Sequence, residues 1–129
     1  MNPPVFHTQN INMGGDASVS RRSAWIPLEG FRNFALEIAL PSTGSPIGVV
    51  SVEVCNHGQA GIAGAALSSD KLDGLTQPST GAAWACFVDN IQTSAGFVAL
   101  VYTRTSGGTG AAFTDSTGTA SGPILVLKE

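Results

Sequence analysis

Short apolar stretches separated by turn-forming residues follow one another along most of the chain. In residues 33–40 an apolar side chain recurs at every second position: Phe34, Leu36, Ile38 and Leu40. Because successive side chains of a strand point to opposite faces, this period of two predicts a strand with one buried face.

From residue 23 onward, such stretches come at the spacing that is typical of a β-sandwich or β-barrel. We predict seven strands, at residues 24–28, 33–40, 48–55, 83–89, 96–104, 111–114 and 123–127. The fold class is therefore all-β, and we expect a single antiparallel β-sandwich, jelly-roll-like or Ig-like, with an extended N-terminal arm.

Turn residues between the strands suggest how the strands pair. Strands 33–40 and 48–55 are expected to form a hairpin across the turn-rich segment 41–46. The glycine-rich segment 105–110 is expected to turn strand 96–104 back into residues 111–114. Strand 96–104 is the most apolar and is expected to be central.

Strand 83–89 is less clear, because both of its faces are apolar. It is expected to be either a central strand or a strand with one face against a neighbouring subunit. Pro27 cannot donate a ladder hydrogen bond, which places strand 24–28 at an edge or a strand end.

Residues 1–22 differ from the rest, with two prolines, two glycines, few apolar residues and no period. They are predicted to be an extended arm, or else a floppy terminus, beside a sandwich domain at 23–129. Residues 57–81 are rich in small residues and predict a variable loop. A short helix around 63–75 is conceivable there, although Gly64 and Gly74 disfavour it.

Charge limits the function classes. Charged residues are 12% of the chain, about half of what a soluble domain usually carries. The net charge of −3 and a pI near 5.2 disfavour a nucleic-acid partner, which needs clustered Lys and Arg. No apolar run is long enough to span a membrane, and the first residues do not read as a signal peptide. We expect no membrane partner and synthesis in a cytoplasm.

The chain carries none of the common nucleophile, phosphate-loop or zinc-protease motifs. Its two histidines, His7 and His57, have no evident partner for general acid–base chemistry. The GGTG segment at 107–110 is better explained by a turn than by a phosphate cradle, since neither a helix nor a lysine directly follows it. We therefore predict that the protein is not an enzyme and has no cofactor.

Metal binding has a weak signal. Cys55, His57 and Cys86 give three ligands where structural zinc usually has four. Asp70 and Asp73 offer too few oxygens for calcium. We predict no metal site and thiols packed as small apolar side chains, while a disulfide between the two cysteines stays open.

Aromatic and arginine side chains have competing roles. Trp25, Trp84, Phe87 and Tyr102 are expected in the core, with a sugar-stacking platform as the weaker alternative. Arg104 precedes a glycine turn, where its guanidinium can clamp backbone carbonyls or a carboxylate.

A neutral Ser-, Thr- and Gly-rich chain, in which these types supply 40 of 129 residues, lacks the charges that keep monomers apart. In a closed symmetric assembly, copies cover one another's apolar patches and strand edges. This composition favours an assembly protein.

Two segments carry a resemblance to a known family. The stretch PIGVVSVEVCN at 46–56 and FVALVYTRTSGGTG at 97–110 resemble small tailed-bacteriophage virion proteins, together with NFALEI at 33–38 and FVDNI at 87–91. The matching positions are Gly48, Ser51, Glu53, Asn56 and residues 102–110, whereas Cys55 departs from the pattern. The resemblance spans about 33–56 and 86–114 and implies a β-sandwich of the capsid-decoration or tail-associated type, commonly trimeric and not an enzyme.

We therefore expect a virion structural protein, most simply a capsid decoration or stabilising subunit, that assembles in the host cytoplasm. Its expected partners are copies of itself, as a homotrimer, and the major capsid protein or other virion proteins. The assembly interface is expected to include arm residues and arginines: Val5, Phe6, Ile11, Arg21, Arg22 and Arg104. The alternative is a host-receptor or carbohydrate-binding module that uses Trp84, Tyr102 and the loop near His57.

Overall fold

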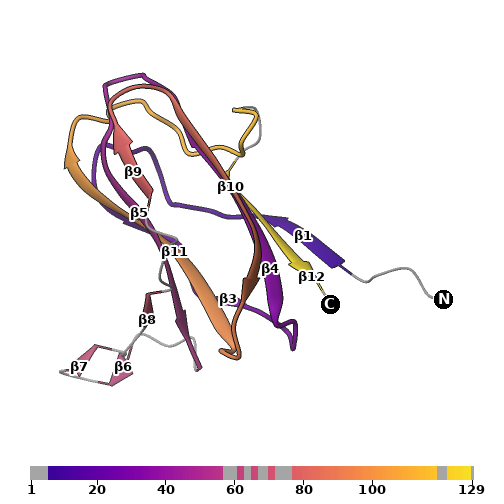
Figure 1. The fold of residues 1–129 in the computed structure, drawn as a ribbon. Helices are drawn as coiled ribbons and strands as arrows, with labels where there is room; N and C mark the ends of the chain where they lie inside the picture. The colour runs from indigo at the N-terminus through magenta and orange to yellow at the C-terminus, as the bar shows by residue number, and fades with distance from the viewer. Residues whose placement is uncertain are drawn as a thin grey trace.

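The computed structural model describes residues 6–56, 61–62, 65–66, 70–71, 77–118 and 122–128. Within these residues all regular structure is β, and two antiparallel sheets form a sandwich (Figure 1). This confirms the predicted fold class. One sheet has four strands, in the order β1 (Phe6–Asn10), β12 (Ile124–Lys128), β4 (Asn33–Leu40) and β10 (Trp84–Gln92).

The second sheet has six strands. Its main path runs β2 (Arg21–Arg22), β11 (Phe97–Ser106), β5 (Ile47–Cys55) and β8 (Asp70–Lys71), while β3 (Ile26–Pro27) pairs with β11 and β9 (Gln77–Thr80) with β5. A small hairpin of β6 (Gly61–Ile62) and β7 (Ala65–Ala66) is separate from both. The conceivable helix at 63–75 is wrong where it can be checked, because residues 65–66 and 70–71 are strands; the other residues of that segment lie outside the described ones.

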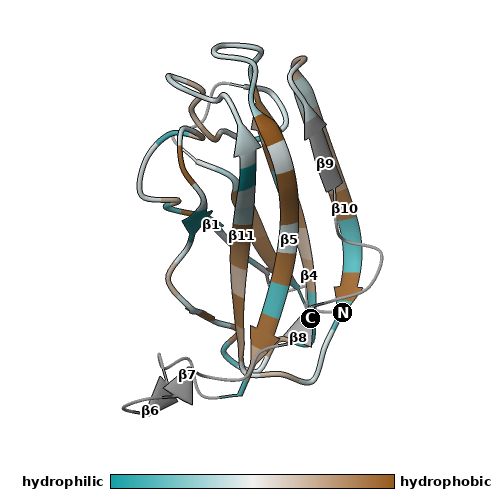
Figure 2. Ribbon diagram, turned by 90° about the vertical axis from the view of Figure 1, so that its left-hand side faces the viewer, coloured by the Kyte–Doolittle hydropathy of each residue, from teal (hydrophilic) through white to brown (hydrophobic). Residues whose placement is uncertain are grey.

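The core lies between the two sheets and follows the predicted alternation. On β4, the side chains of Phe34, Leu36, Ile38 and Leu40 are all buried, and β5 and β11 supply the facing layer: Val50, Val52, Val54, Val98, Leu100 and Tyr102. Figure 2 shows the brown apolar bands that run along β5 and β11. Burial of these side chains is the main favourable contribution to folding.

Two predicted hairpins are wrong. Strands β4 and β5 lie in different sheets, so residues 41–46 cross from one layer to the other instead of closing a hairpin. Residues 111–114 form no strand beside β11; Thr114 makes a single bridge to Ala39 in the four-stranded sheet. The cause is the glycine turn: Gly107, Gly108 and Gly110 do have positive φ, as predicted, but they lead the chain across to the other sheet.

Three predicted strand positions can also be compared with the structure, and two of them are corrected. Strand β10 is an edge strand of its sheet, so its central placement is wrong. Strand β11 is internal, between β5 on one side and β2 and β3 on the other, as predicted. Only Ile26–Pro27 of the predicted strand 24–28 pairs, beside β11.

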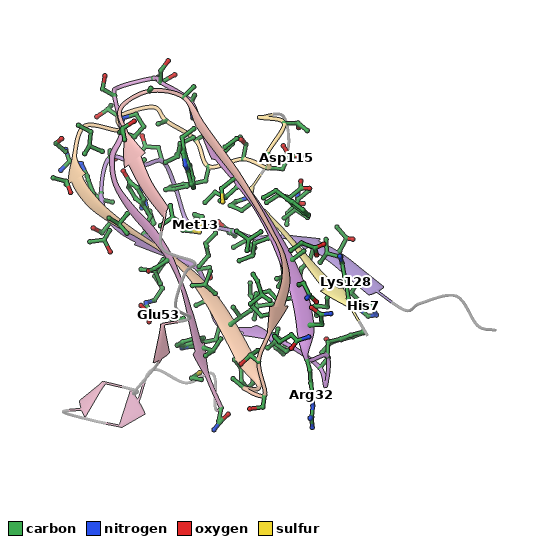
Figure 3. All side chains as sticks on the ribbon, in the orientation of Figure 1. His7, Met13, Arg32, Glu53, Asp115 and Lys128 are labelled. Atoms are coloured by element: carbon green, nitrogen blue, oxygen red, sulfur yellow. The ribbon has the colours of Figure 1, made fainter. Side chains whose placement is uncertain are left out.

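The N-terminal segment packs onto the sandwich. Strand β1 pairs in antiparallel register with β12. Beyond it, Ile11 and Met13 are 2% and 5% exposed and belong to the core, and Ala17 is fully buried. Figure 3 shows the Met13 side chain inside the molecule.

Candidate functional site

The outer face of the four-stranded sheet carries an unusual exposed aromatic side chain. Phe87 on β10 is 58% exposed, the most exposed large apolar side chain among the described residues. The strand register places Phe87 and Ile124 on either side of Glu37, in one row across β10, β4 and β12. We call this row the strip; Glu37 separates its two apolar side chains, and Phe87 supplies its exposed apolar surface at the free edge.

A groove of about 430 Å³ lies beside this row, toward the end of the sheet where β4 ends and β10 begins. We call it the alanine groove. Its lining is small and mostly apolar: Ala39, Leu40, Pro41, Ala83, Trp84, Ala85, Gly110, Ala112, Thr114, Ser116, Thr117 and Gly118. Ala83, Ala85 and Ala112 are exposed, so small side chains leave room there for a partner's larger ones.

The turn at residues 115–118 forms one wall of the groove and is held by its own hydrogen bonds. The carboxylate of Asp115 accepts from the backbone N–H of Thr117 at 3.0 Å and from the Thr117 hydroxyl at 2.6 Å. The Ser116 hydroxyl donates to Glu37 Oε2 at 3.1 Å, which ties the wall to the middle of the sheet. Asp115 lies at this turn in Figure 3. The groove wall is therefore fixed before any partner arrives.

A bulge follows Phe87 toward the other end of β10. The pairing with β4 shifts between Val88 and Ile91, and Asn90 has a φ of 56°. Asp89 accepts a hydrogen bond from Lys128 Nζ at 2.9 Å, and this bond lowers the pKa of the Asp89 carboxyl. Bulges and charges are the usual means of blocking edge-to-edge pairing. The free edge open to a partner is thus the first half of β10, which includes Phe87.

The outer face of the six-stranded sheet is completed by its own residues. Glu53 on β5 is only 6% exposed, and Arg22 on β2 reaches across β11 to bind its Oε1 at 2.6 Å. The Arg22 guanidinium also lies 5.5 Å from the centre of the Trp25 ring. Ala99 in the middle of this face is fully buried. No large apolar side chain of the described part of this face matches the exposure of Phe87.

Most of the predicted interface residues have partners within the chain. Arg21 Nε donates to the Asp16 carbonyl at 2.8 Å, and Arg22 is bound to Glu53. Arg104 Nε donates to the Gly107 carbonyl at 2.7 Å, which confirms the predicted carbonyl clamp. Ile11 is buried in the core. Val5 and the side chain of Phe6 lie outside the described residues, so their interface role stays a prediction.

Asp16 joins the N-terminal segment to the glycine turn after β11. Its Oδ1 accepts from the Ser18 hydroxyl and backbone N–H, and its Oδ2 accepts from the Gly110 N–H at 2.8 Å. The bond from the Ser18 hydroxyl, then the Gly110 N–H, and more weakly the charge of Arg21 lower the pKa of Asp16 to about 2. The Gly110 N–H of the glycine turn is therefore bound by the protein's own carboxylate.

The predicted metal and aromatic groups are dispersed. Cys55 and Cys86 lie in different sheets and form no disulfide, burial raises the pKa of the Cys86 thiol, and His57 lies outside the described residues. No group of three potential metal ligands occurs in the part of the chain that the structure describes. Tyr102 is fully buried, whereas Trp84 is half-buried and lines the alanine groove. A sugar platform of all four aromatic residues is therefore not present.

No known family model matches the chain, and neither does any curated protein or solved structure. Among the described residues, no helix could cross a membrane. What the molecule itself defines is an antiparallel β-sandwich with one self-completed face and one face that carries an exposed strip and groove.

Proposed function

We propose that this protein is a structural subunit of a bacteriophage virion, a capsid decoration or stabilising protein that assembles as a symmetric oligomer, most simply a homotrimer. The observation that carries this proposal is the exposed strip of Phe87 beside the alanine groove, on the free edge of the four-stranded sheet. Exposed apolar surface next to an unpaired strand edge is typical of an interaction site.

The phage setting is supported by the sequence resemblance. The two segments that carry it, around Gly48 and around Tyr102, lie side by side, because β5 pairs with β11 in the register Val50 to Tyr102 and Gly48 to Arg104. A Cβ added at Gly48 would come within 2.7 Å of the Tyr102 ring and 2.5 Å of the Thr103 carbonyl oxygen, so position 48 beside Tyr102 has room only for a glycine. The residues that carry the resemblance thus pack together in the six-stranded sheet, whereas the proposed binding surface, the strip and the alanine groove, lies on the four-stranded sheet.

The expected partners are further copies of the chain and the major capsid protein. In a cyclic trimer, each copy can place its exposed Phe87 side chain over the small residues of the next copy's groove, so that every groove is filled once around the ring. Cyclic oligomers close by such head-to-tail contacts, and burying an exposed Phe stabilises each contact by roughly 1.5–3 kcal/mol.

The test compares two substitutions of exposed apolar residues. Phe87→Ser removes the exposed aromatic side chain of the strip, whereas Val19→Ser changes a residue that is 49% exposed and lies outside the strands. Both variants and the parent protein are measured for their mass in sedimentation equilibrium and for retention on purified phage heads and tails.

We expect the parent and Val19→Ser proteins to be oligomers retained on heads, and Phe87→Ser to be a folded monomer that is released. Equal masses and equal retention for all three proteins would contradict the assigned surface. A parent protein that binds neither heads nor tails would contradict the virion role itself.

A second candidate function is supported by Trp84. This half-buried indole lines the alanine groove together with the hydroxyl-bearing residues Thr114, Ser116 and Thr117, and aromatic faces with nearby hydroxyls suit a neutral sugar. The alternative is therefore a host-receptor module that binds surface polysaccharide in this groove.

Two variants separate glycan binding from a packing role. Because Trp84 also packs on the core, Trp84→Ala should lower the stability by about 2–3 kcal/mol in either case. Ser116→Ala removes one wall hydroxyl, together with its hydrogen bond to Glu37, without touching the core. Loss of polysaccharide binding in folded Ser116→Ala protein would favour the receptor module, and no binding by the parent protein would exclude it.

A further inference from the structure

The strand β1 is held to the sandwich by its backbone. Its side chains from His7 to Asn10 are all exposed, and the ladder pairs it with β12 from Phe6 opposite Lys128 to Asn10 opposite Ile124. Beyond the ladder, His7 contacts Glu29 at 3.8 Å and the Phe31 ring at 5.5 Å between ring centres, both near the surface. Figures 1 and 3 show β1 beside β12 at the side of the molecule from which both termini leave, with His7 near Lys128.

Two buried side chains follow the strand and fix its register. Ile11 and Met13 enter the core, with the exposed Asn12 between them. The Ile11 N–H donates to the Pro123 carbonyl at 2.7 Å, which extends the pairing by one residue beyond the strand. Gly122 has no side chain, and a Cβ there would collide with the Ile11 carbonyl oxygen. The edge at residues 122–128 is thus shaped for the segment 6–13.

A hinge follows the second anchor. Gly14 and Gly15 are exposed and have φ of 83° and 153°, and the Asn12 side chain caps the turn by accepting from the Gly14 N–H at 2.8 Å. Immediately after the hinge the chain is fastened again, by Asp16 to the Gly110 N–H and by the Ala17 N–H to the Ala111 carbonyl at 2.9 Å. The anchored segment 6–13 is therefore separated from its domain by two glycines.

We propose that the segment 6–13 is an exchangeable arm and that the edge of β12 is its docking site in a second copy of the chain. In the exchanged form, β1, Ile11 and Met13 of one copy fill the edge and the core of the next, and the second copy's arm is donated onward or back. This inference deepens the proposed assembly function and rests on it.

The energetic argument is that each contact of the arm is remade in the exchanged form. The same ladder, the same two buried side chains and the same Gly122 approach occur between chains instead of within one, so only the hinge and the association entropy differ. Higher protein concentration therefore favours exchange by mass action. An arm that crosses between copies would link subunits without needing more interface surface.

The test uses two cysteine substitutions that face each other in the ladder, each made in a chain whose own Cys55 and Cys86 are replaced by alanine. Thr8 lies opposite Val126, and directly opposed residues of an antiparallel pair have Cβ atoms close enough for a disulfide. Thr8→Cys protein and Val126→Cys protein are unfolded, mixed, refolded at a series of concentrations and oxidised, and the linked peptides are identified by mass spectrometry. Thr8→Cys mixed with Val19→Cys, an exposed position outside the ladder, is the matched control.

We expect a Thr8→Cys to Val126→Cys linkage between chains that grows with concentration and exceeds the control linkage at least tenfold. An oligomer that forms without this linkage would overturn the exchange while leaving the assembly function standing. A protein that stays monomeric at all concentrations would overturn both.

A hinge variant gives an independent readout. An alanine at a positive φ costs about 1 kcal/mol or more, so Gly14→Ala should raise the exchanged fraction at least about fivefold by straining the closed turn. Gly30→Ala is the matched control, since Gly30 also has a positive φ of 85° and, like Gly14, has nothing within 4 Å of an added Cβ. Equal exchanged fractions in the two variants would contradict the hinge.

Discussion

The outer faces of the two sheets differ in how their side chains are covered. Across the six-stranded sheet, Arg22 binds the nearly buried Glu53 and lies against Trp25, so that face is closed by its own side chains. Across the four-stranded sheet, Phe87 stands exposed beside a groove of small residues. Of the charged residues there, Asp89 and Lys128 bind each other at the bulge end, and Glu37 accepts a hydrogen bond from Ser116.

This difference shows that a chain with few charges can confine its exposed apolar surface to one of its two outer faces. A closed outer face contributes to the stability of the single sandwich, whereas an open face contributes to contacts with other molecules. The two roles are separable by mutation, because each sheet presents its own outer side chains.

The largest effect is expected from one substitution made on each face. Ala99→Leu overpacks a fully buried position of the six-stranded sheet and should lower the free energy of unfolding by about 2–3 kcal/mol. Ala85→Leu places the same side chain on the exposed floor of the alanine groove and should leave unfolding unchanged while it weakens self-association. Urea unfolding and sedimentation measure the two quantities, and equal destabilisation by both variants would contradict the comparison.

Breaking the ion pair of the closed face should have the next largest effect. Arg22→Ala removes the 2.6 Å partner of a carboxylate that is mostly buried, at a cost of about 1–3 kcal/mol. Lys128→Ala breaks the exposed pair with Asp89 and should cost less, since water screens that pair. Thermal unfolding of both variants ranks the two pairs, and a greater loss for Lys128→Ala would refute the ranking.

Among the described side chains of the six-stranded sheet, one buried polar atom lacks a hydrogen-bond partner. The Tyr102 hydroxyl is buried and receives none in this structure. Tyr102→Phe keeps the edge-to-face contact with the Phe113 ring, at 5.2 Å between centres, and removes the unsatisfied hydroxyl. We expect a gain of about 1 kcal/mol in urea unfolding. A loss of stability would show that the hydroxyl is satisfied in solution.

The smallest expected effect is the loss of stability at acid pH that follows from the protonation of Asp16. The pKa of Asp16 is about 2 in the folded protein against an ordinary value of 3.8, so its bonds to Ser18 and Gly110 stabilise the fold fully above about pH 4. That contribution is lost as the pH falls from 4 to 2. Asp16→Asn should melt lower than the parent at pH 6, and the difference should shrink by pH 2. A difference independent of pH would exclude this carboxylate as its source.

Alternation predicted individual strands well and their partners poorly. Strand 33–40 has the predicted ends because Phe34, Leu36, Ile38 and Leu40 mark one face without ambiguity. Nothing local states which sheet the next strand joins, so the expected hairpin of β4 and β5 proved to be a crossover.

The exposure of Phe87 could not be predicted from the sequence for a related reason. Along β10 both alternating sets are apolar, so the pattern could not tell that Trp84 faces inward and Phe87 outward. The buried anchors Ile11 and Met13 were equally hidden, because two apolar residues among polar ones give no period. Their burial comes from packing against the core of the sandwich, which no local pattern announces.

The mass of the parent protein in solution, measured by light scattering over a dilution series, tests the central claim most directly. An exposed strip and groove that bind copies of the chain predict a mass that is a fixed multiple of 13.1 kDa, threefold for a trimer, and that falls on dilution. A mass of 13.1 kDa at every concentration would contradict the claim that the open face of the four-stranded sheet is a self-association surface.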